Sequence, residues 1–257
     1  MHRDLEGRVA IVTGGSDGIG LATAVLLARR GARVTICGRR RERLKLAKAA
    51  IEAEGGVAEA MRLDVSDFDG LTAMIADIGR RHGRLDMLVN NAMSTHYAPI
   101  ERLTVDQWRK DFTVNADAAF VATRATMRIM AQGGGGSIVN VASTCGIRAA
   151  ANMASYSASK AALIHFSAVA AMEGAPQGIR VNAVVPGQVQ TAGTEEFAVR
   201  APQIAARTAE AIPMKRGGSP EELARAIVFL LSDEASYVTG VALPVDGGKA
   251  AQLYMPS

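Results

Sequence analysis

The strongest constraint on the fold is the alternation, along 257 residues, of short β-branched apolar runs with longer amphipathic stretches. Residues 8–13 form the first such run and predict a buried strand, and residues 19–30 predict the helix after it. Further strands are expected at residues 33–37, 57–63, 85–89, 137–141, 179–185 and 241–245. Further helices are expected at residues 41–54, 68–82, 105–130, 154–172, 194–212 and 220–232. Strands that alternate with helices build βαβ units, so the pattern predicts an α/β fold: a doubly wound parallel sheet with helices on both faces.

Composition favours one globular domain over residues 1–257 and argues against several other classes of protein. The chain is 49% hydrophobic, which provides a large core, and its sequence has no linker, low-complexity block or internal repeat. Aromatic residues make up only 4%, and the 29 basic and 25 acidic residues are mostly interspersed, which argues against nucleic-acid binding. The sequence begins with polar residues, and no uninterrupted apolar stretch reaches about 18 residues. We therefore expect a cytoplasmic protein that binds neither nucleic acid nor membranes.

A glycine-rich turn, GGSDGIG at residues 14–20, connects the first predicted strand to the first predicted helix. Glycines allow a tight turn and let a pyrophosphate approach the backbone, and the helix N-terminus adds free N–H groups and partial positive charge. Elsewhere such a turn would be an ordinary connection, so its place after the first strand is what indicates a dinucleotide site. The candidate cofactor-binding residues of this turn are Gly14, Ser16, Asp17, Gly18, Ile19 and Gly20.

The end of the second predicted strand indicates which dinucleotide binds. In folds of this kind an acidic residue there bonds the 2′-hydroxyl of NAD, whereas basic groups accommodate the 2′-phosphate of NADP. Here Arg39 and Arg40 follow the strand without an acid, and two guanidinium groups are suited to bond a phosphate. The same arginines could be a solvated basic cluster, and Asp17 could either repel a 2′-phosphate or cap the following helix. We expect NADP, with NAD as the alternative.

Tyr156 and Lys160 lie four residues apart near the start of a predicted helix, on one helical face. A free tyrosine has a pKa of about 10, and a neighbouring ammonium lowers that pKa towards the range useful for general acid–base catalysis. The spacing alone is common on protein surfaces, so its context matters. Ser143 follows the fifth predicted strand, and ligands of open parallel sheets bind beyond the carboxyl ends of the strands. Together these three side chains predict a site that protonates the oxygen of a carbonyl substrate.

The sequence resembles the short-chain dehydrogenase/reductase family, 3-oxoacyl reductases among its members, from Val9 to about Gly248. The motifs that carry the resemblance are residues 13–20, Asp64-Val65, Asn90-Asn91-Ala92, Asn115, Ser143, Tyr156 with Lys160, Pro186-Gly187 and residues 246–248. The resemblance implies a Rossmann-type fold and an NADP(H)-dependent oxidoreductase that reduces a carbonyl to an alcohol, or the reverse, by hydride transfer. An NAD-dependent alcohol dehydrogenase and a cofactor-binding regulator without turnover are the alternatives.

The resemblance also implies a role for each matching residue. Tyr156 is implied as the acid/base, Ser143 as a partner of the substrate oxygen, and Lys160 as a ligand of the nicotinamide ribose that lowers the pKa of Tyr156. Asn115 is implied to hold a water molecule in a proton relay through Lys160. Further cofactor contacts are implied for Asp64, Val65, Asn91, Ala92, Tyr156, Lys160, Pro186, Gly187, Val189 and Thr191.

Some features depart from the family pattern or leave alternatives open. Met93 stands where the family usually has glycine, so it could narrow the pocket, shift the strand end or pack against the substrate. Cys145 and His96 follow strand ends and could line the substrate pocket, and no spacing of His, Cys or carboxylate residues indicates a metal site. Residues 188–214 are expected to form a substrate-binding loop or lid.

The expected partner is a small-molecule carbonyl or alcohol: a 3-oxoacyl thioester, a steroid-like ketone, a sugar or polyol, or a small keto compound. The resemblance also implies assembly into a homotetramer or homodimer. The long helices expected at residues 105–130 and 154–172 are the candidate assembly surfaces.

Overall fold

The strands form one parallel sheet. The computed structural model describes residues 4–252, so residues 1–3 and 253–257 of the expected domain lie outside the described part. The strands are β1 Val9–Thr13, β2 Arg33–Gly38, β3 Val57–Arg62, β4 Met87–Asn90, β5 Gly136–Val141, β6 Ile179–Pro186 and β7 Ala242–Val245. Their order is β3-β2-β1-β4-β5-β6-β7, and every neighbouring pair is parallel. This is the doubly wound arrangement of Rossmann-type folds, as the sequence predicts.

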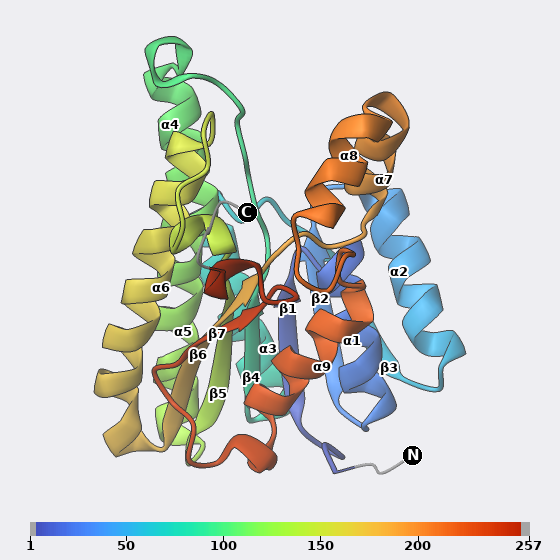
Figure 1. Cartoon of the computed structure of the whole chain (residues 1–257). Helices are drawn as coiled ribbons and strands as arrows, with labels where there is room; N and C mark the ends of the chain where they lie inside the picture. The colour runs from blue at the N-terminus through green and yellow to red at the C-terminus, as the bar shows by residue number, and fades with distance from the viewer. Residues whose placement is uncertain (1–3, 253–257) are drawn as a thin grey trace.

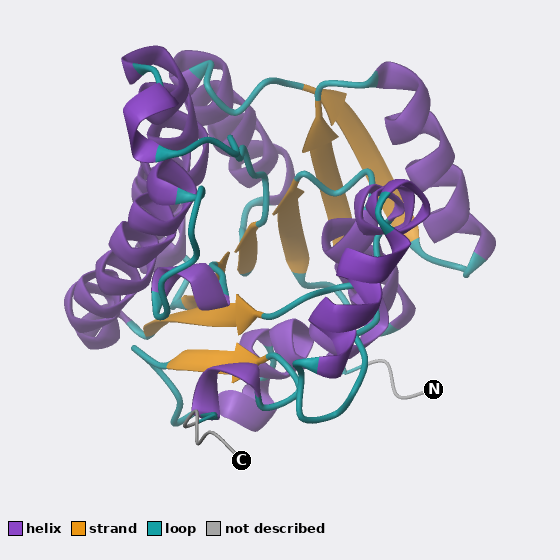
Figure 2. Ribbon diagram, turned by 45° about the horizontal axis from the view of Figure 1, so that its top comes forward, coloured by secondary structure: helices purple, strands orange, loops and turns teal. Residues whose placement is uncertain are grey.

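Helices cover both faces of the sheet (Figure 1), and Figure 2 shows the twisted strands between the two helical layers. One layer contains α1 Gly18–Arg29, α2 Arg41–Ala53 and α9 Pro220–Leu231, and the other contains α3 Phe68–His82, α5 Ala118–Gln132 and α6 Ala154–Gly174. One core cluster includes Leu27 of α1 and Ile227 of α9, and the other includes Ile75 of α3 and Val121 of α5. Because apolar side chains are buried on both faces, the strands read as nearly continuous hydrophobic runs.

Local sequence signals set the ends of the helices. The side chain of Asp67 caps the first turn of α3, and Gly83 ends this helix with a φ of 67°, a conformation that favours glycine. Helix α9 begins with Pro220 in its first turn and a capping box formed by Ser219 and Glu222. Both helices therefore have the predicted bounds to within one residue.

The stretch at residues 105–130 is helical throughout, but it is not one regular α-helix. It consists of α4 Val105–Phe112 and α5, joined by a π-helical turn at Thr113–Asp117. In this turn the amide of Ala118 donates to the carbonyl of Thr113, five residues earlier, so one extra residue is accommodated without ending the helix. Such turns are frequent at functional sites, and this one contains Asn115.

The prediction of one helix at residues 194–212 is wrong. The segment forms α7 Ala192–Arg200 and α8 Pro202–Glu210, which meet at Ala201. Proline has no amide hydrogen and disfavours helical backbone in the preceding residue, and Ala201 accordingly has a φ of −140° and a ψ of 63°. The two short helices lie above the sheet, beside the carboxyl ends of the strands (Figure 1).

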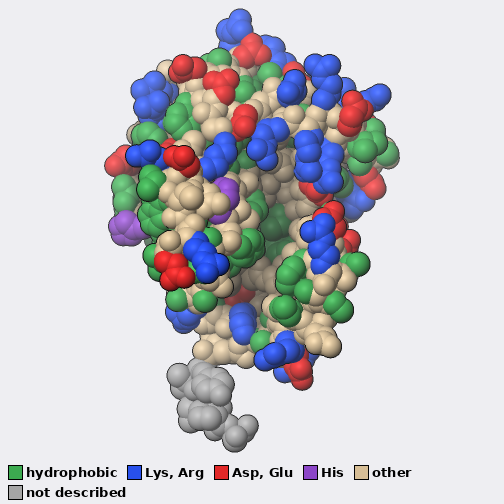
Figure 3. Space-filling model, turned by 90° about the horizontal axis from the view of Figure 1, so that it is seen from above, with side chains coloured by type: hydrophobic (Ala, Val, Ile, Leu, Met, Phe, Trp, Pro, Cys, Tyr) green, Lys and Arg blue, Asp and Glu red, His purple; other side chains and the backbone are tan. Residues whose placement is uncertain are grey.

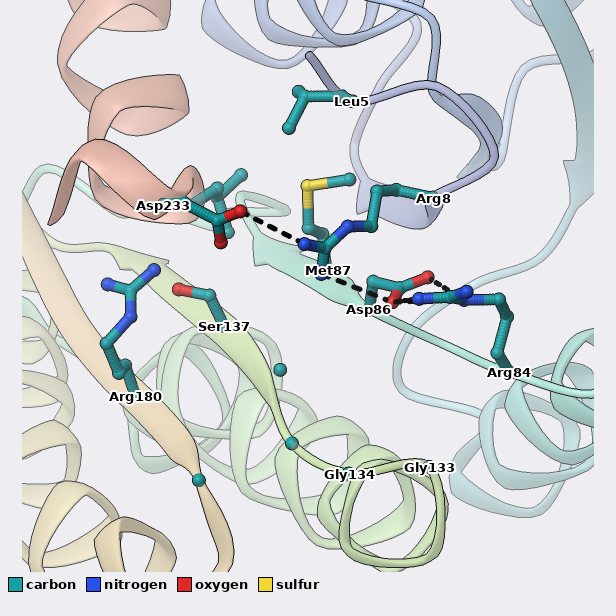
Figure 4. A pocket seen from close by; sticks show the side chains of 14 residues that line it. Leu5, Arg8, Arg84, Asp86, Met87, Gly133, Gly134, Ser137, Arg180 and Asp233 are labelled. Atoms are coloured by element: carbon teal, nitrogen blue, oxygen red, sulfur yellow. Dashed lines mark hydrogen bonds and ion pairs between the residues drawn. The ribbon is translucent and has the colours of Figure 1, made fainter. Parts of the chain in front are cut away.

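A polar cavity of about 580 Å³ lies at the opposite end of the sheet, where the strands begin. The buried carboxylate of Asp86 accepts a hydrogen bond from the Val9 amide at 2.8 Å and bonds to the Arg84 guanidinium at 2.5 to 3.1 Å. Arg8 lies 3.6 Å from Asp86 and 3.1 Å from Asp233. Figure 4 shows these charged groups turned towards one another. These bonds connect the start of β1 to the residue before β4. We therefore interpret the charged groups at this end of the sheet as stabilising the fold.

Candidate active site

The carboxyl ends of the strands border a groove of about 560 Å³. Figure 3 looks onto this end of the molecule and shows a hollow between two raised walls, with Lys and Arg side chains around its rim. The strand order reverses here between β1 and β4, which is where open α/β sheets bind ligands. The predicted cofactor-binding residues that line the groove are Gly14, Ser16, Asp17, Gly18, Ile19, Arg39, Arg40, Asp64, Val65, Asn91, Ala92 and Thr191.

Side-chain hydrogen bonds hold the turn at residues 14–20 against the end of β4. Asn91 Nδ2 donates to the carbonyls of Thr13 and Gly14 at 3.0 and 3.1 Å, and Thr13 Oγ1 accepts from the Asn91 amide at 2.9 Å. Gly20 lies behind this turn, and a Cβ on it would collide with the Gly14 carbonyl oxygen and with Asn91 Nδ2. Gly20 is therefore required for close packing of α1 against the turn.

Asp17 has the capping role that the sequence offered as one alternative. Its side chain accepts a hydrogen bond from the Gly18 amide at 2.9 Å at the start of α1. The same carboxylate forms an ion pair with Arg43 of α2, and Arg40 Nη2 lies 3.7 Å from it. Two guanidinium groups thus offset the negative charge of the turn. Among the described residues Arg39 has no carboxylate within ion-pair distance, so its guanidinium remains available to a ligand.

Asp64 follows β3 and lies beside positive charge. Burial alone would raise its pKa, but hydrogen bonds from Ser66 and the charges of Lys110 and Arg39 outweigh this effect and lower the pKa. Its Oδ1 accepts from the Ser66 amide at 3.0 Å and from the Ser66 hydroxyl at 2.5 Å. These bonds fix one carboxylate oxygen, and the residue borders the groove as expected for a contact to the adenine.

The phenol of Tyr156 is half-buried in the first turn of α6. Burial raises its pKa to about 12 because it disfavours the phenolate, and a hydrogen bond with Ser143 offsets only part of this effect. Lys160 is not among the causes of this shift, so its implied effect on the Tyr156 pKa stays a prediction. Lys160 Nζ lies 5.8 Å from the centre of the Tyr156 ring, and burial is the largest cause of the raised pKa. The tyrosine is therefore in the neutral, proton-donating form.

Lys160 is only 2% exposed, and burial lowers its pKa to about 8. Its Nζ donates a hydrogen bond to the Val141 carbonyl at 2.7 Å. An ammonium has three donors, and no carboxylate of the described residues pairs with it. Buried donors without partners are costly, so this group fits a ligand with hydroxyl acceptors, such as a ribose.

Asn115 lies in the π-helical turn and is buried. Its Nδ2 donates to the Ser94 carbonyl at 2.8 Å and to Ser159 Oγ at 2.9 Å, and its Oδ1 accepts from the Ser94 amide at 2.8 Å. The side chain therefore ties the loop after β4 to the helix that carries Tyr156. Its implied role in a water relay stays a prediction.

The segment after β6 has the expected place beside the groove. A Cβ on Gly187 would lie 2.8 Å from that of Asp246, so the chain passes close to the loop after β7. Val189 is buried and pairs with Gly218 in an isolated β-bridge, and Thr191 caps α7 and lines the groove. These contacts position the predicted closing segment between the sheet and α7.

Met93 lines the groove with 49% of its surface exposed. It does not shift the end of β4, because Asn90 keeps its register opposite Asn140 of β5 and the Ser94 amide bonds to Asn115. Of the alternatives raised by this departure from the family pattern, the structure favours a side chain that shapes the groove.

Sequence reasoning missed three charged residues of this region. Arg43 pairs with Asp17, Lys110 lines the groove near Asp64, and Asp111 is a fully buried carboxylate between α4 and α6. Arg43 follows Arg40 by three residues at the start of α2, so helical spacing could have indicated it. No sequence signal indicated Asp111, because its partners lie 15 to 44 residues away in the chain.

A family model described as enoyl-(acyl carrier protein) reductase matches residues 14–250. The chain is 39% identical to the 3-oxoacyl-(acyl-carrier-protein) reductase FabG of Thermotoga maritima, over 95% of this chain and 98% of the relative. It is 39% identical to the 2,5-dichloro-2,5-cyclohexadiene-1,4-diol dehydrogenase LinX of Sphingobium indicum, over 96% and 98% of the two chains. The chain therefore belongs to the short-chain dehydrogenase/reductase family. It is an NAD(P)-dependent oxidoreductase that acts on CH–OH groups.

Solved structures agree with this assignment. A short-chain dehydrogenase/reductase from Burkholderia xenovorans superposes with a TM-score of 0.95 at 35% identity, covering 99% of this chain and 100% of the other. An NAD⁺-bound xylitol dehydrogenase superposes with a TM-score of 0.90 at 33% identity, covering 95% and 99%. A gluconate 5-dehydrogenase from Beutenbergia cavernae with bound NADP superposes with a TM-score of 0.91 at 39% identity, covering 98% and 100%. Both dinucleotides thus occur among structures similar to this chain.

Two further observations concern residues 4–252. No helix in this part of the chain is long and apolar enough to cross a membrane. In the same range, no group of three or more His, Cys, Asp or Glu side chains is placed to hold a metal ion.

Proposed function

We propose that this enzyme is an NADP(H)-dependent carbonyl reductase in which Tyr156 gives a proton to the substrate oxygen. The observation that carries the proposal is the neutral phenol of Tyr156, hydrogen-bonded to Ser143 beside the buried ammonium of Lys160. A tyrosine whose pKa is about 12 is protonated at neutral pH, so it can give a proton to the substrate oxygen.

The residues present fit a dinucleotide. The turn at residues 14–20 and the start of α1 would hold the pyrophosphate, Asp64 and Val65 the adenine, and Lys160 the nicotinamide ribose. The uncommitted guanidinium of Arg39, with Arg40 beside it, favours a 2′-phosphate and hence NADP. NAD is the alternative, since Asp17 brings a carboxylate to the same rim.

In this mechanism the bound cofactor supplies the hydride, and the protein supplies position and a proton. Ser143 Oγ is held by the Cys145 amide at 3.2 Å and, with Tyr156, bonds the carbonyl oxygen of the substrate. Tyr156 protonates that oxygen as the alcohol forms, which contributes on the order of 10²–10⁴-fold to the rate. The resulting phenolate is stabilised by the Lys160 ammonium, and Asn115 holds the surrounding loop in place.

The substrate class follows from the walls of the groove. Met93 lines the groove, Tyr97 lies in the loop after β4 close enough to Tyr156 to affect its pKa, and Phe197 lies in α7. All three are large side chains with 47 to 71% of their surface exposed. We therefore propose a small ketone with an apolar body, with residues 188–214 as a lid that closes over it. The cytoplasmic location and the homotetramer or homodimer inferred from the sequence stay predictions.

The substitution Tyr156→Phe tests whether Tyr156 is the proton donor. Tyr237→Phe is the matched control, because Tyr237 is fully exposed. Tyr156→Phe should lower kcat for NADPH-dependent ketone reduction at least 100-fold and leave the Kd of NADPH within about twofold. Tyr237→Phe should behave as the wild type. Retained turnover in Tyr156→Phe would refute the assignment.

The test of the cofactor compares kcat/KM for NADPH and NADH in Arg39→Ala. Loss of one bidentate partner of the 2′-phosphate should lower kcat/KM for NADPH at least tenfold and leave kcat/KM for NADH nearly unchanged. Arg41→Ala, two residues away and exposed, is the matched control. A wild-type preference for NADH that Arg39→Ala does not alter would favour the NAD-dependent alternative.

A further inference from the structure

The carboxylate of Asp111 is completely buried beside the active site, and its acceptor positions are filled. Oδ1 accepts from the Ser94 hydroxyl and His96 Nδ1, both at 2.8 Å. Oδ2 accepts from the His96 amide at 3.2 Å and from the Ser155 hydroxyl at 2.5 Å. An ionised carboxylate offers about four acceptor positions, so this group is fully satisfied. Among the described residues its one basic partner is His96, since no Lys or Arg lies within ion-pair distance.

These bonds join three elements that are far apart in the sequence. Asp111 belongs to α4, Ser94 and His96 to the loop after β4, and Ser155 to the first turn of α6. Ser155 directly precedes Tyr156. The loop after β4 also pairs with the start of α6, because the Ala98 amide donates to the Asn152 carbonyl at 2.9 Å. Asp111 therefore connects the wall that borders the cofactor groove to the residue next to the proton donor.

The hydrogen bonds also fix the state of His96. A carboxylate only accepts, so Nδ1 must carry the proton whether or not the ring is charged. The Asp111 carboxylate and the His96 ring form one hydrogen-bonded unit. Displacement of either group would leave buried polar atoms without partners.

We propose that Asp111 is a positioning residue for the reaction: it holds Tyr156, through Ser155, at a fixed place relative to the loop that borders the cofactor. This inference rests on the proposed role of Tyr156 as the proton donor. Productive geometry in enzymes is sensitive to displacements of about 1 Å, which can cost about 100-fold in rate. Loss of the Ser155 bond releases the first turn of α6 from the loop, so it should reduce turnover without removing any group that contacts the cofactor.

The chain offers a matched pair of substitutions for the test. Ser155 and Ser157 flank Tyr156. The Ser155 hydroxyl bonds to Asp111, whereas the buried Ser157 hydroxyl has no hydrogen-bond partner within residues 4–252. Ser155→Ala should lower kcat for ketone reduction about tenfold. The Kd of NADPH, read by its fluorescence, should stay within twofold. Ser157→Ala should leave kcat within twofold of the wild type. Equal effects of the two substitutions would overturn the proposal.

A double-mutant cycle separates positioning through Asp111 from a local effect of Ser155. In the Asp111→Ala background, Ser155→Ala should have no further effect on kcat, because both acceptor oxygens are already lost. Additive losses would refute the connection. If Asp111→Ala fails to fold, Ser155→Thr replaces it, since threonine keeps a hydroxyl that can donate to Asp111. Ser155→Thr should keep most of the wild-type kcat, and a loss equal to that of Ser155→Ala would refute the connection. Failure of the proposed function is distinct: Tyr156→Phe would then retain turnover whatever the result at Ser155.

Discussion

The carboxylate of Asp17, in the first cofactor-binding turn, forms an ion pair with the guanidinium of Arg43 on the neighbouring helix α2. The sequence left open whether Asp17 would repel a phosphate, because nothing near it in the chain indicated a counter-charge. The fold brings Arg43 across 26 residues to supply one. The net charge beside the adenosine end of the groove is therefore set by the packing of α1 and α2.

Substitution of Arg43 should leave the negative charge of Asp17 without its ion-pair partner on α2. Arg43→Ala is expected to raise the KM for NADPH about tenfold, because a like charge near a phosphate is repulsive, and to change the KM for NADH less than twofold. Asp17→Ala in the same background should restore the KM for NADPH. Initial-rate kinetics with both cofactors measure this, and an equal loss for both would contradict it.

The buried Lys160 should make stability depend on pH in alkaline solution. Its folded-state pKa of about 8 lies below the unfolded value of about 10.4, so the unfolded state binds more protons between these pH values. The contribution of Lys160 to the free energy of unfolding therefore rises with pH there. The unfolding free energy of the wild type minus that of Lys160→Met should increase by about 2 kcal/mol from pH 7 to pH 10. Urea denaturation measures the difference, and Lys45→Met on the exposed side of α2 is the control.

Gly20, behind the turn at residues 14–20, and Gly193, which lines the groove, should differ sharply in their tolerance of a methyl group. A Cβ on Gly20 would collide with the backbone of the turn, whereas a Cβ on Gly193 would have open space around it. Gly20→Ala should raise the Kd of NADPH at least tenfold by displacing the turn. Gly193→Ala should leave it within twofold. Fluorescence titration of NADPH distinguishes them, and similar affinities would show that the turn adapts.

The charged network at the other end of the sheet should affect stability and not catalysis. Asp86 has a side chain only 6% exposed and bonds to the Val9 amide and Arg84, whereas Asp233 is 84% exposed (Figure 4). Asp86→Asn should lower the free energy of unfolding by about 3 kcal/mol, because a buried charge network loses its anion. Asp233→Asn should cost less than about 1 kcal/mol. Urea unfolding and kcat measured together check both expectations.

Much of the fold was predictable because its signals are local. The central strands β1, β4 and β6 are apolar runs that lie between two helical layers, and caps such as Asp67 and Ser219 lie beside the residues they cap. The π-helical turn at Thr113–Asp117 has no comparable signal, since it depends on how α4 and α5 pack on the sheet and on α6. The break at Ala201 could have been predicted, because Pro202 is visible in the sequence.

The candidate site shows the same division. Residues on strand ends and in the glycine-rich turn were predictable from motifs, and most of them border the groove. The direction in which the Tyr156 pKa shifts could not be predicted from motifs, because burial of the ring in the folded chain is the largest cause of the shift. Arg43 and Asp111 act through partners on other elements, which only the folded chain brings within reach.

The two helices that meet at Ala201 have a practical consequence for altering what the enzyme accepts. Neither α7 nor α8 has a buried residue, whereas α4 on the opposite wall carries the buried Asp111. A library of substitutions spread over α7 and α8 would therefore cost little stability and leave the proton donor in place. In a library on α4, the clones that change Asp111 would be mostly inactive. The enzyme thus has one wall suited to directed evolution and one in which Asp111 should be kept constant.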